Sequence, residues 1–442
     1  MINFFKTLIA EIAYATNMKI RPNLSASKVA EIEELLIEIL LRVPPKAMLK
    51  SKRVSKQWQS IISDSKFCLS YARFRPKVSL LLKEEGERSK VQVISLNRPI
   101  RMENNVVVKD FIAFNGHHTD IIQSCKGLLL CKSSLLLLDP RRDDSTFDGH
   151  LRCFAYCVCN PTTGQFRRIV CPSSLSPPSS PNPYLIRYTH ALFSVSLVFN
   201  PQVSNHYKVV FIFDWDAPKE YANIYPAHYG IEIFIYSSET QSWSWQRRDE
   251  LDYGRTSSMV KNNGPFCCNG VIHWFRYDSS YRTGFVLRFD PYTMVFETID
   301  FPYSFYFFGF AEYRGNLQMI TREFDRTSLE FIVWEVSLDY SKFYKRYCID
   351  LESIRRVHPS WNISPLSIFY IICGENIKDT EFVISVENMA VIYNHSDRTY
   401  RVISEIERTP QNQRYYSNIS QCRRPLACYY KAFEYLESYC CV

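Results

Sequence analysis

Residues 157–169 read CVCNPTTGQFRRI, which is an apolar run, a polar turn and a return run led by an aromatic residue. Three other stretches share this plan: IFIYSSETQSWSW at 233–245, LRFDPYTMVFETI at 287–299 and VIYNHSDRTYRVI at 391–403. A short turn rich in Asn, Asp, Ser or Pro between two strand-like runs is typical of a β-hairpin. The sequence therefore predicts a series of antiparallel hairpins beyond Pro76.

The spacing of the turns predicts how these hairpins are organised. Taken as markers, Asn160, Asn200, Ser238 and Asp290 follow one another at intervals of about 40 to 50 residues. Loose repeats of this length, each forming one small sheet, are typical of propeller blades. A distorted propeller and a stacked-sheet sandwich both remain open, because the repeats are divergent.

Composition supports a mainly-β body and places the net charge outside it. Aromatic residues make up 15% of the 442 residues, and they favour pleated, half-buried surfaces. The formal net charge is +8, but the stretch from Arg42 to Lys77 alone holds ten Lys or Arg residues against one acid, Asp64. The rest of the chain is nearly neutral, so we expect no large basic groove for nucleic acid on the β body.

Targeting signals are weak in this sequence. No segment approaches the roughly 18 apolar residues that a membrane span needs. The apolar run near the N-terminus is broken by Lys6 and Glu11 and has no basic region before it, so we do not expect a secretory signal. We expect a cytoplasmic or nuclear protein without membrane contact, whose 15 cysteines remain thiols.

Residues 31–65 follow a helical rather than a strand-like period. A first helix should end at Val43-Pro44-Pro45, because proline lacks the amide hydrogen. A second should begin at Pro45, and a third should end near Ser63-Asp64-Ser65. Three helices of this size bury little surface, so we expect them to gain stability from a partner. The apolar positions are Leu35, Leu36, Ile39 and Leu40 in the first helix and Val54, Trp58, Ile61 and Ile62 in the third.

Two other interpretations of these helices stay open. The apolar residues could simply form the core of a small bundle, since core and contact residues look alike on a helical wheel. The unit could also be a helix-turn-helix with 50–62 as its recognition helix, although Lys, Gln and Ser on its exposed face are common on solvated helices.

The helical stretch resembles the plant-type F-box in order and spacing, through the segments 37–40, 42–44, 52–58 and 62–64 together with Phe67. That family docks on the Skp adaptor of a cullin-RING ubiquitin ligase while the rest of the chain holds the protein to be ubiquitinated. The usual opening Leu-Pro is replaced here by Glu31 and Ile32, which puts the first adaptor contact in doubt. The resemblance implies adaptor contacts by Leu35, Leu36, Ile39, Leu40, Pro44, Leu49, Val54 and Trp58.

The β body resembles the F-box-associated domain that follows many plant F-boxes. The matching phrases are SCKGLLL at 124–130, NPTTGQF at 160–166, CNGVIHW at 268–274 and FDPYTMVFETI at 289–299. With the F-box, this resemblance covers most of the chain from about Val29 onward. It implies a kelch-like propeller that binds a protein target, with no target-binding residue identified.

The sequence offers no catalytic motif of fixed spacing, such as Gly-x-Ser-x-Gly, a phosphate-binding Gly-rich loop or His-Glu-x-x-His. We expect Cys153, Cys157 and Cys159 to be buried thiols of one strand face rather than metal ligands. His117-His118 fits a polar loop, and His273 fits a buried, hydrogen-bonded strand residue. The aromatic stretch 214–229 is a candidate for partner binding.

The sequence thus predicts an α+β multidomain protein: a three-helix F-box followed by a mainly-β, propeller-like domain of repeated small antiparallel sheets. We expect an N-terminal extension at 1–26, the F-box at 27–75, the β domain at 76–410 and a segment at 411–442 that is a candidate to close the last sheet. The predicted function is a non-catalytic substrate receptor with no cofactor and no metal. The alternatives are a degenerate F-box paralogue acting as a stand-alone binding propeller, a propeller enzyme and a nucleic-acid-binding protein.

Overall fold

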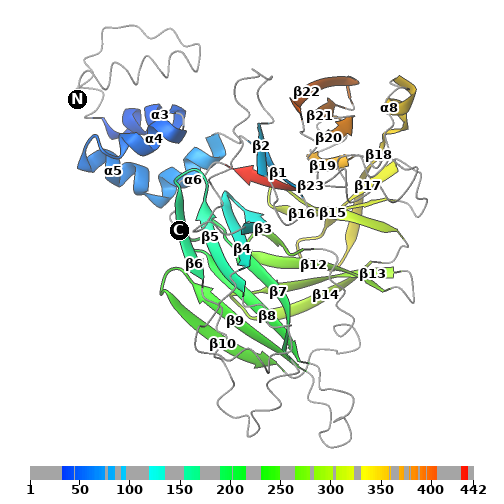
Figure 1. Cartoon of the computed structure of the whole chain (residues 1–442), viewed down its shortest axis with the longest axis horizontal. Coiled ribbons are helices and arrows are strands. Elements are labelled where there is room, and N and C mark those ends of the chain that lie inside the picture. Colours follow the sequence, from blue (N-terminus) through cyan, green and yellow to red (C-terminus); the bar gives the residue numbers. More distant parts are fainter. Residues whose placement is uncertain are drawn as a thin grey trace, which may run out of the picture.

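The chain begins with a helical unit and continues into a body of small sheets (Figure 1). A computed structural model describes residues 32–43, 45–74, 78–84, 91–95, 119–134, 154–169, 190–201, 203–215, 230–248, 264–278, 283–301, 305–322, 330–357, 359, 368–372, 378, 380–386, 389–394, 396–405 and 430–436. None of the helices in these residues is long and apolar enough to cross a membrane.

Four described helices form the helical unit, namely α3 (Glu33–Arg42), α4 (Pro45–Ser51), α5 (Lys56–Ser63) and α6 (Ser65–Phe74). As predicted, α3 ends at Val43 in an extended conformation. Ser55 caps α5, since its Oγ accepts a hydrogen bond from the Trp58 backbone N–H at 3.1 Å. Asp64 ends α5, and its carboxylate accepts from the first turn of α6, a helix that we did not predict.

One apolar core holds the helical unit together. Leu36 and Leu40 of α3, Met48 of α4, and Trp58 of α5 are buried in it. Tyr71 on α6 closes the core, and its hydroxyl donates a 2.6 Å hydrogen bond to the Val43 carbonyl, where α3 ends. The fourth helix therefore completes a bundle that three helices would leave open on one side.

Twenty-three described strands form six antiparallel sheets, five of four strands and one of three. The three-stranded sheet contains β1 (Val78–Glu84), β2 (Val91–Ser95) and β23 (Tyr430–Leu436). The next two sheets are β3 (Thr119–Cys125), β4 (Leu128–Ser134), β5 (Phe154–Asn160) and β6 (Gln165–Ile169), then β7 (His190–Val198), β8 (Lys208–Trp215), β9 (Gly230–Ser237) and β10 (Ser242–Arg248).

Three further four-stranded sheets complete the body. They are β11 (Phe266–Cys268), β12 (Val271–Asp278), β13 (Thr283–Asp290) and β14 (Val295–Phe301), then β15 (Tyr306–Tyr313), β16 (Asn316–Arg322), β17 (Glu330–Val336) and β18 (Phe343–Asp350), then β19 (Ile368–Ile372), β20 (Glu381–Val386), β21 (Met389–Asn394) and β22 (Thr399–Glu405). A short helix, α8 (Glu352–Val357), follows β18.

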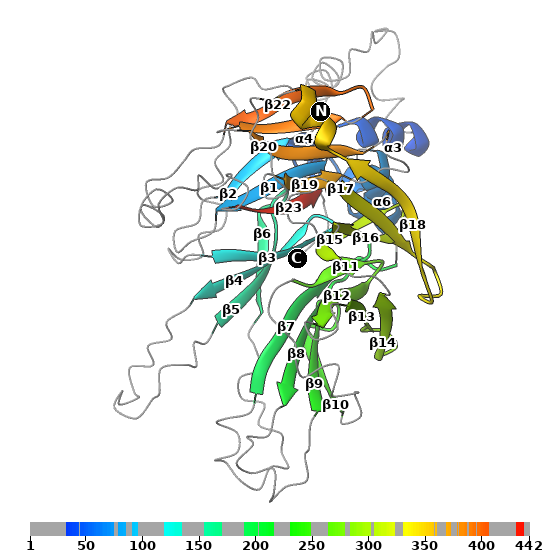
Figure 2. The ribbon, with the colours of Figure 1, turned by 90° about the vertical axis from the view of Figure 1, so that its right-hand side faces the viewer.

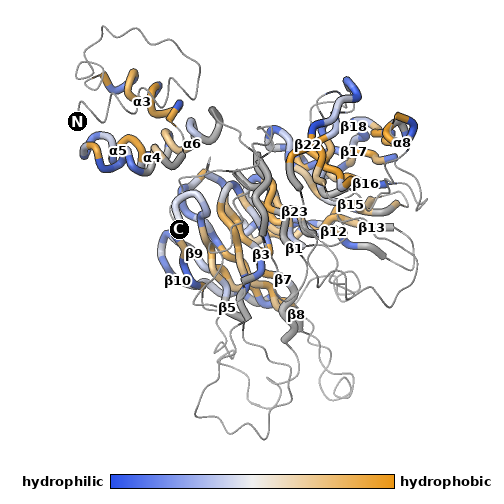
Figure 3. The backbone as a smooth tube through the Cα atoms, turned by 45° about the horizontal axis from the view of Figure 1, so that its top comes forward, coloured by the Kyte–Doolittle hydropathy of each residue, from blue (hydrophilic) through white to orange (hydrophobic). Residues whose placement is uncertain are grey.

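The small sheets are arranged as a propeller, which confirms the predicted fold class (Figures 1 and 2). Apolar residues concentrate along the strands of these sheets in Figure 3, and the main core clusters mix residues of neighbouring sheets. Phe211 of β8, for example, packs edge-on against Tyr156 of β5 at a ring distance of 5.1 Å. The body is therefore held together by contacts between successive sheets.

The two ends of the propeller chain meet in one sheet. In Figure 1, the strand near the C-terminus, β23 in red, lies beside β1 in blue, and Val78 pairs with Leu436. β23 also contacts β3 and β19. The segment 411–442 thus contributes a strand to the sheet of β1 and β2, while β19 to β22 form a complete sheet without it.

All four predicted hairpins are confirmed, as β5–β6, β9–β10, β13–β14 and β21–β22. The marker Asn200 was wrong, because it lies between β7 and β8, in the same sheet as Ser238. The Asn-Pro pair indicates a turn within this sheet and does not mark the start of a new blade. A fifth hairpin of the same kind, β17–β18, was not predicted, although its turn at 337–342 carries Ser and Asp like the others.

Candidate protein-docking site

The structure divides the predicted adaptor-binding residues into buried and exposed ones. Leu36, Leu40 and Trp58 are buried in the core of the helical unit, with Trp58 only 2% exposed. In this conformation they contact other residues of the helical bundle. For these three residues, the alternative that they form the core of a small bundle is therefore correct. What they do in the structure is to hold the helices together.

Another part of the predicted set stays at the surface. Leu35 is 43% exposed, and Ile39 and Val54 are half-buried at the margin of the same core. Pro44 and the side chain of Leu49 lie outside the described part of the structure. Sequence reasoning missed Ile32, which is 45% exposed and lies one helical turn before Leu35. The signal was present, since positions 32, 35 and 39 share one helical stripe.

Charges of both signs surround these apolar residues. Glu33, Glu34 and Glu38 are exposed on α3, and Glu38 forms an ion pair with Arg42 one turn later. On the other helices the exposed charges are mostly basic: Lys50, Arg53, Lys56 and Lys66. The unit therefore presents an acidic helix with an apolar stripe next to a basic region, which is a surface suited to a partner with matching charges.

The propeller has one end closed by tight turns, here called the hairpin end. Three hairpins between the first two strands of a sheet turn at Lys126-Gly127, Asn269-Gly270 and Arg314-Gly315, and both residues of each pair have positive φ. Such turns match the twist of the strands and need glycine at the second position. The family phrases SCKGLLL and CNGVIHW are two of these hairpins.

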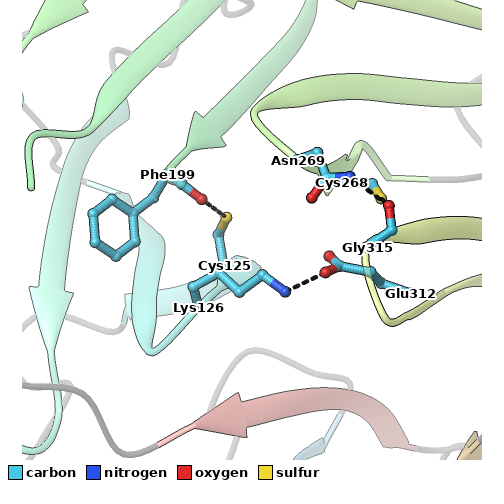
Figure 4. A network of polar contacts seen from close by, with 7 residues as sticks. All are labelled: Cys125, Lys126, Phe199, Cys268, Asn269, Glu312 and Gly315. Carbon is cyan, nitrogen blue, oxygen red and sulfur yellow. Dashed lines mark hydrogen bonds and ion pairs between the residues drawn. The ribbon is translucent and has the colours of Figure 1, made fainter. Parts of the chain in front are cut away.

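Polar contacts join these turns across sheets (Figure 4). Lys126 Nζ lies 2.5 Å from Glu312 Oε1, and the Asn269 side chain donates to the Gly315 carbonyl. Cys125 Sγ donates to the Phe199 carbonyl at 3.3 Å. The hairpins of four different sheets are thereby tied into one rigid end.

At the opposite end of the propeller, the ends of the described strands are separated by longer stretches of sequence. They comprise 135–153 between β4 and β5, 170–189 between β6 and β7, 216–229 between β8 and β9, and 249–263 between β10 and β11. These residues are outside the described structure, as are most of the candidate stretch 214–229 and the residues His117, His118 and Cys153.

The described candidates for chemistry are structural. Cys157 and Cys159 are buried, and Cys159 Sγ lies 3.8 Å from the Sγ of buried Cys131. Within the described residues no group of His, Cys, Asp and Glu has the arrangement of a metal site.

The prediction for His273 is confirmed, because this residue is fully buried in β12 and its Nε2 lies 3.1 Å from the Tyr340 hydroxyl. The rings of His273 and Tyr340 stack with centroids 5.6 Å apart. Burial lowers the pKa of His273 to about 3, so its imidazole is neutral near pH 7.

Comparison with known proteins matches both parts of the chain. Residues 33–70 match the F-box domain, and residues 77–422 match the F-box associated beta propeller domain. An F-box protein of Arabidopsis thaliana is 25% identical over 408 residues, which cover 87% of this chain and 87% of that protein. Another from the same plant is 23% identical over 388 residues, covering 84% of this chain and 96% of its own length.

Solved structures are more distant. YCF48 from Cyanidioschyzon merolae is 9% identical, and the match covers 75% of this chain and 88% of that one with a TM-score of 0.32. A similarity of this size supports no conclusion about this chain.

Proposed function

The chain belongs to the family of F-box proteins with an F-box associated β-propeller domain, and we propose that it is the substrate receptor of a Skp-cullin-F-box ubiquitin ligase. In this role the helical unit binds the Skp-type adaptor and the propeller binds a protein target. The receptor performs no bond chemistry itself. It raises the effective concentration of target lysines near the ubiquitin-conjugating enzyme.

One observation carries the proposal: the unit that matches the F-box keeps an apolar stripe outside its own core. Ile32 and Leu35 are both more than two-fifths exposed, although α3 has a well-packed buried face. Exposed leucine and isoleucine side chains on a small bundle favour a partner that covers them. We propose Leu35, Ile39 and Val54 as adaptor contacts, with Ile32 supplying the apolar contact where the family has Leu-Pro.

The basic side chains beside this stripe favour an acidic adaptor surface. Lys50, Arg53 and Lys56 are at least partly exposed and have no described ion-pair partner within the chain. Such charges act mainly on the rate of encounter and on partner choice, and less on final affinity. We therefore expect adaptor binding to weaken with added salt but to depend on the apolar stripe.

For the target, we propose the end of the propeller opposite to the hairpin end. The turns of the hairpin end are short and bound to one another, whereas the connections 135–153, 170–189, 216–229 and 249–263 are long in sequence. Recognition residues are most often carried by long loops on a rigid scaffold. Replacing 216–229 with a short Gly-Ser linker should abolish target binding and leave adaptor binding unchanged.

The adaptor half is tested by one exposed substitution and a matched control. Leu35→Asp in the full-length chain should reduce binding to a purified plant Skp adaptor about tenfold or more, because it places a carboxylate in an apolar contact. Leu338→Asp makes the same chemical change at a propeller residue that is 86% exposed, and should leave binding unchanged. Trp58→Ala and Leu40→Ala are unsuitable, since both residues belong to the core.

The affinities are measured by calorimetry, with circular dichroism to check folding. Equal binding by the wild type, Leu35→Asp and Leu338→Asp would show that the apolar stripe is not part of the adaptor interface. A folded wild-type chain that does not bind the adaptor at all would favour the alternative of a stand-alone binding propeller without a ligase.

A further inference from the structure

Three polar side chains lie near the seam between the sheet β3–β6 and the sheet β7–β10, and two of them are joined across it. Tyr236 lies on β9 opposite Val209 of β8. Tyr207, just before β8, exchanges hydrogen bonds with Ser238, since its N–H donates to the Ser238 Oγ at 2.9 Å and its carbonyl accepts from the Ser238 N–H at 3.0 Å. Tyr207 and Tyr236 therefore occupy neighbouring positions on the same face of this sheet.

Arg167 reaches this pair from the facing sheet. It is the central residue of β6, and its Nη1 donates a 3.2 Å hydrogen bond to the Tyr236 hydroxyl. A guanidinium has five N–H donors, and in the described chain no carboxylate forms an ion pair with Arg167. Most of the N–H donors of Arg167 therefore have no anionic partner among the described residues.

Tyr207 adds a second unmatched donor. Its side chain is 1% exposed, and its hydroxyl has no hydrogen-bond partner in the described structure. Buried hydroxyl groups are nearly always hydrogen-bonded, because leaving one without a partner is unfavourable. Burial raises the pKa of Tyr207, so this phenol keeps its proton and remains a donor.

We infer that Arg167, Tyr207 and Tyr236 bind a tetrahedral oxyanion, namely phosphate or a phosphate monoester. The guanidinium supplies charge and a fork of N–H donors, and the two hydroxyls supply further donors from the facing sheet. A planar carboxylate has only two oxygens for these donors, whereas a phosphate offers three or four. The arrangement therefore favours the tetrahedral group.

Aromatic packing fixes the Tyr236 side of the site. Trp243 packs on Tyr236 at a ring distance of 5.4 Å and on Phe211 at 5.5 Å, which holds the Tyr236 ring in place. Trp245, two residues further along the same face of β10, is about half exposed. Its ring lies 6.4 Å from that of Phe234, which is two residues before Tyr236 on β9.

The phosphate can come from solution or from a phosphorylated side chain of a bound protein. The second source rests on the proposed function of the propeller as a target-binding domain, whereas binding of the free ion does not. Neither source involves the helical unit, so the anion site can be tested without the adaptor.

The test titrates the full-length chain with inorganic phosphate and, separately, with acetate at equal ionic strength, by calorimetry. Arg167→Gln should weaken phosphate binding about tenfold or more, and Tyr207→Phe and Tyr236→Phe about threefold to tenfold each, because each removes a donor to a charged acceptor. Arg168→Gln is the matched control, since it removes the same charge from the next residue, which is exposed on the opposite face of β6. It should change binding less than about twofold.

A structural role would give a different result. If Tyr207 served folding alone, Tyr207→Phe would shift the thermal midpoint without changing phosphate affinity, and the site would be refuted. Equal losses for Arg167→Gln and Arg168→Gln, acetate binding as tight as phosphate, or no saturable binding would also refute it.

A peptide pair identifies the source of the phosphate. A phosphoserine peptide that competes with inorganic phosphate, while its unphosphorylated twin does not, assigns the site to a phosphorylated protein. Competition by inorganic phosphate alone assigns it to the free ion. All variants should keep wild-type adaptor binding, so a failure of the adaptor proposal would leave this result unaffected.

Discussion

The helical unit and the propeller both bury large side chains, but the helical unit has a single core, whereas the propeller has several core clusters. Trp58 lies in the single core of four short helices, and that core is all the unit has. Trp274 lies in a cluster that combines residues of three sheets, and further clusters join the other sheets. A small unit with one core has little stability to spare, whereas the propeller distributes its stability over several interfaces.

The largest expected effect comes from removing one tryptophan from each region. Trp58→Ala and Trp274→Ala should each cost about 3 to 5 kcal/mol, because both side chains are almost fully buried. That loss is comparable to the whole stability of a small helical domain, so α3 to α6 should unfold in the first variant. The propeller should remain folded in the second, with a lower thermal midpoint.

Amide hydrogen exchange read region by region distinguishes the two outcomes. Trp274 also donates to the Ser194 hydroxyl at 3.1 Å, but Ser194 keeps a contact with Ser196 in the variant. Protection that is lost throughout the propeller in Trp274→Ala, or retained in the helices of Trp58→Ala, would contradict the comparison.

The second effect concerns pH and should affect only the propeller. In the folded chain the pKa of His273 is about 3, against about 6.5 in an unfolded chain. Protonation therefore favours unfolding. The contribution of His273 to the free energy of unfolding is complete above about pH 6.5 and falls by about 1.4 kcal/mol per pH unit below it. Between pH 6.5 and 5 the propeller should lose about 2 kcal/mol through this residue.

Urea unfolding at several pH values measures this slope. His273→Gln removes the titrating ring, so the difference between wild type and variant isolates its share. Residues 27–75 contain no histidine, and the helical unit should show no such dependence in this range. Parallel pH profiles for wild type and variant would mean that His273 is not protonated on unfolding.

The smallest effect tests a single helix cap. Ser55→Ala removes the oxygen that accepts from the Trp58 N–H and should destabilise the helical unit by about 1 kcal/mol. Ser60→Ala changes an exposed serine within the same helix and should be neutral or slightly stabilising, since alanine is the better helix former. Thermal unfolding followed at 222 nm compares the two, and equal effects would show that the cap contributes nothing.

Local patterns predicted much of both regions. The Pro44-Pro45 stop and the four polar turns act over a few residues, so a sequence pattern is sufficient to place them. The marker Asn200 failed for the same reason: an Asn-Pro turn has the same local chemistry within a sheet as between sheets. The start of the third helix was predicted too early: α5 begins at Lys56 after the Ser55 cap, so Val54 lies outside it. Helix α6 was missed because Asp64 was interpreted only as the end of the third helix, whereas its carboxylate also caps the first turn of α6.

The candidate sites divide in the same way. The sequence determined the family and the helical apolar positions, because motifs and periodicity are local properties of the chain. Only the tertiary structure decided which of those positions are core and which are surface: Leu36, Leu40 and Trp58 turn inward, whereas Leu35 stays exposed beside Ile32. It also brought Arg167 to Tyr236 and joined β23 to β1, because contacts between distant strands depend on how whole sheets pack.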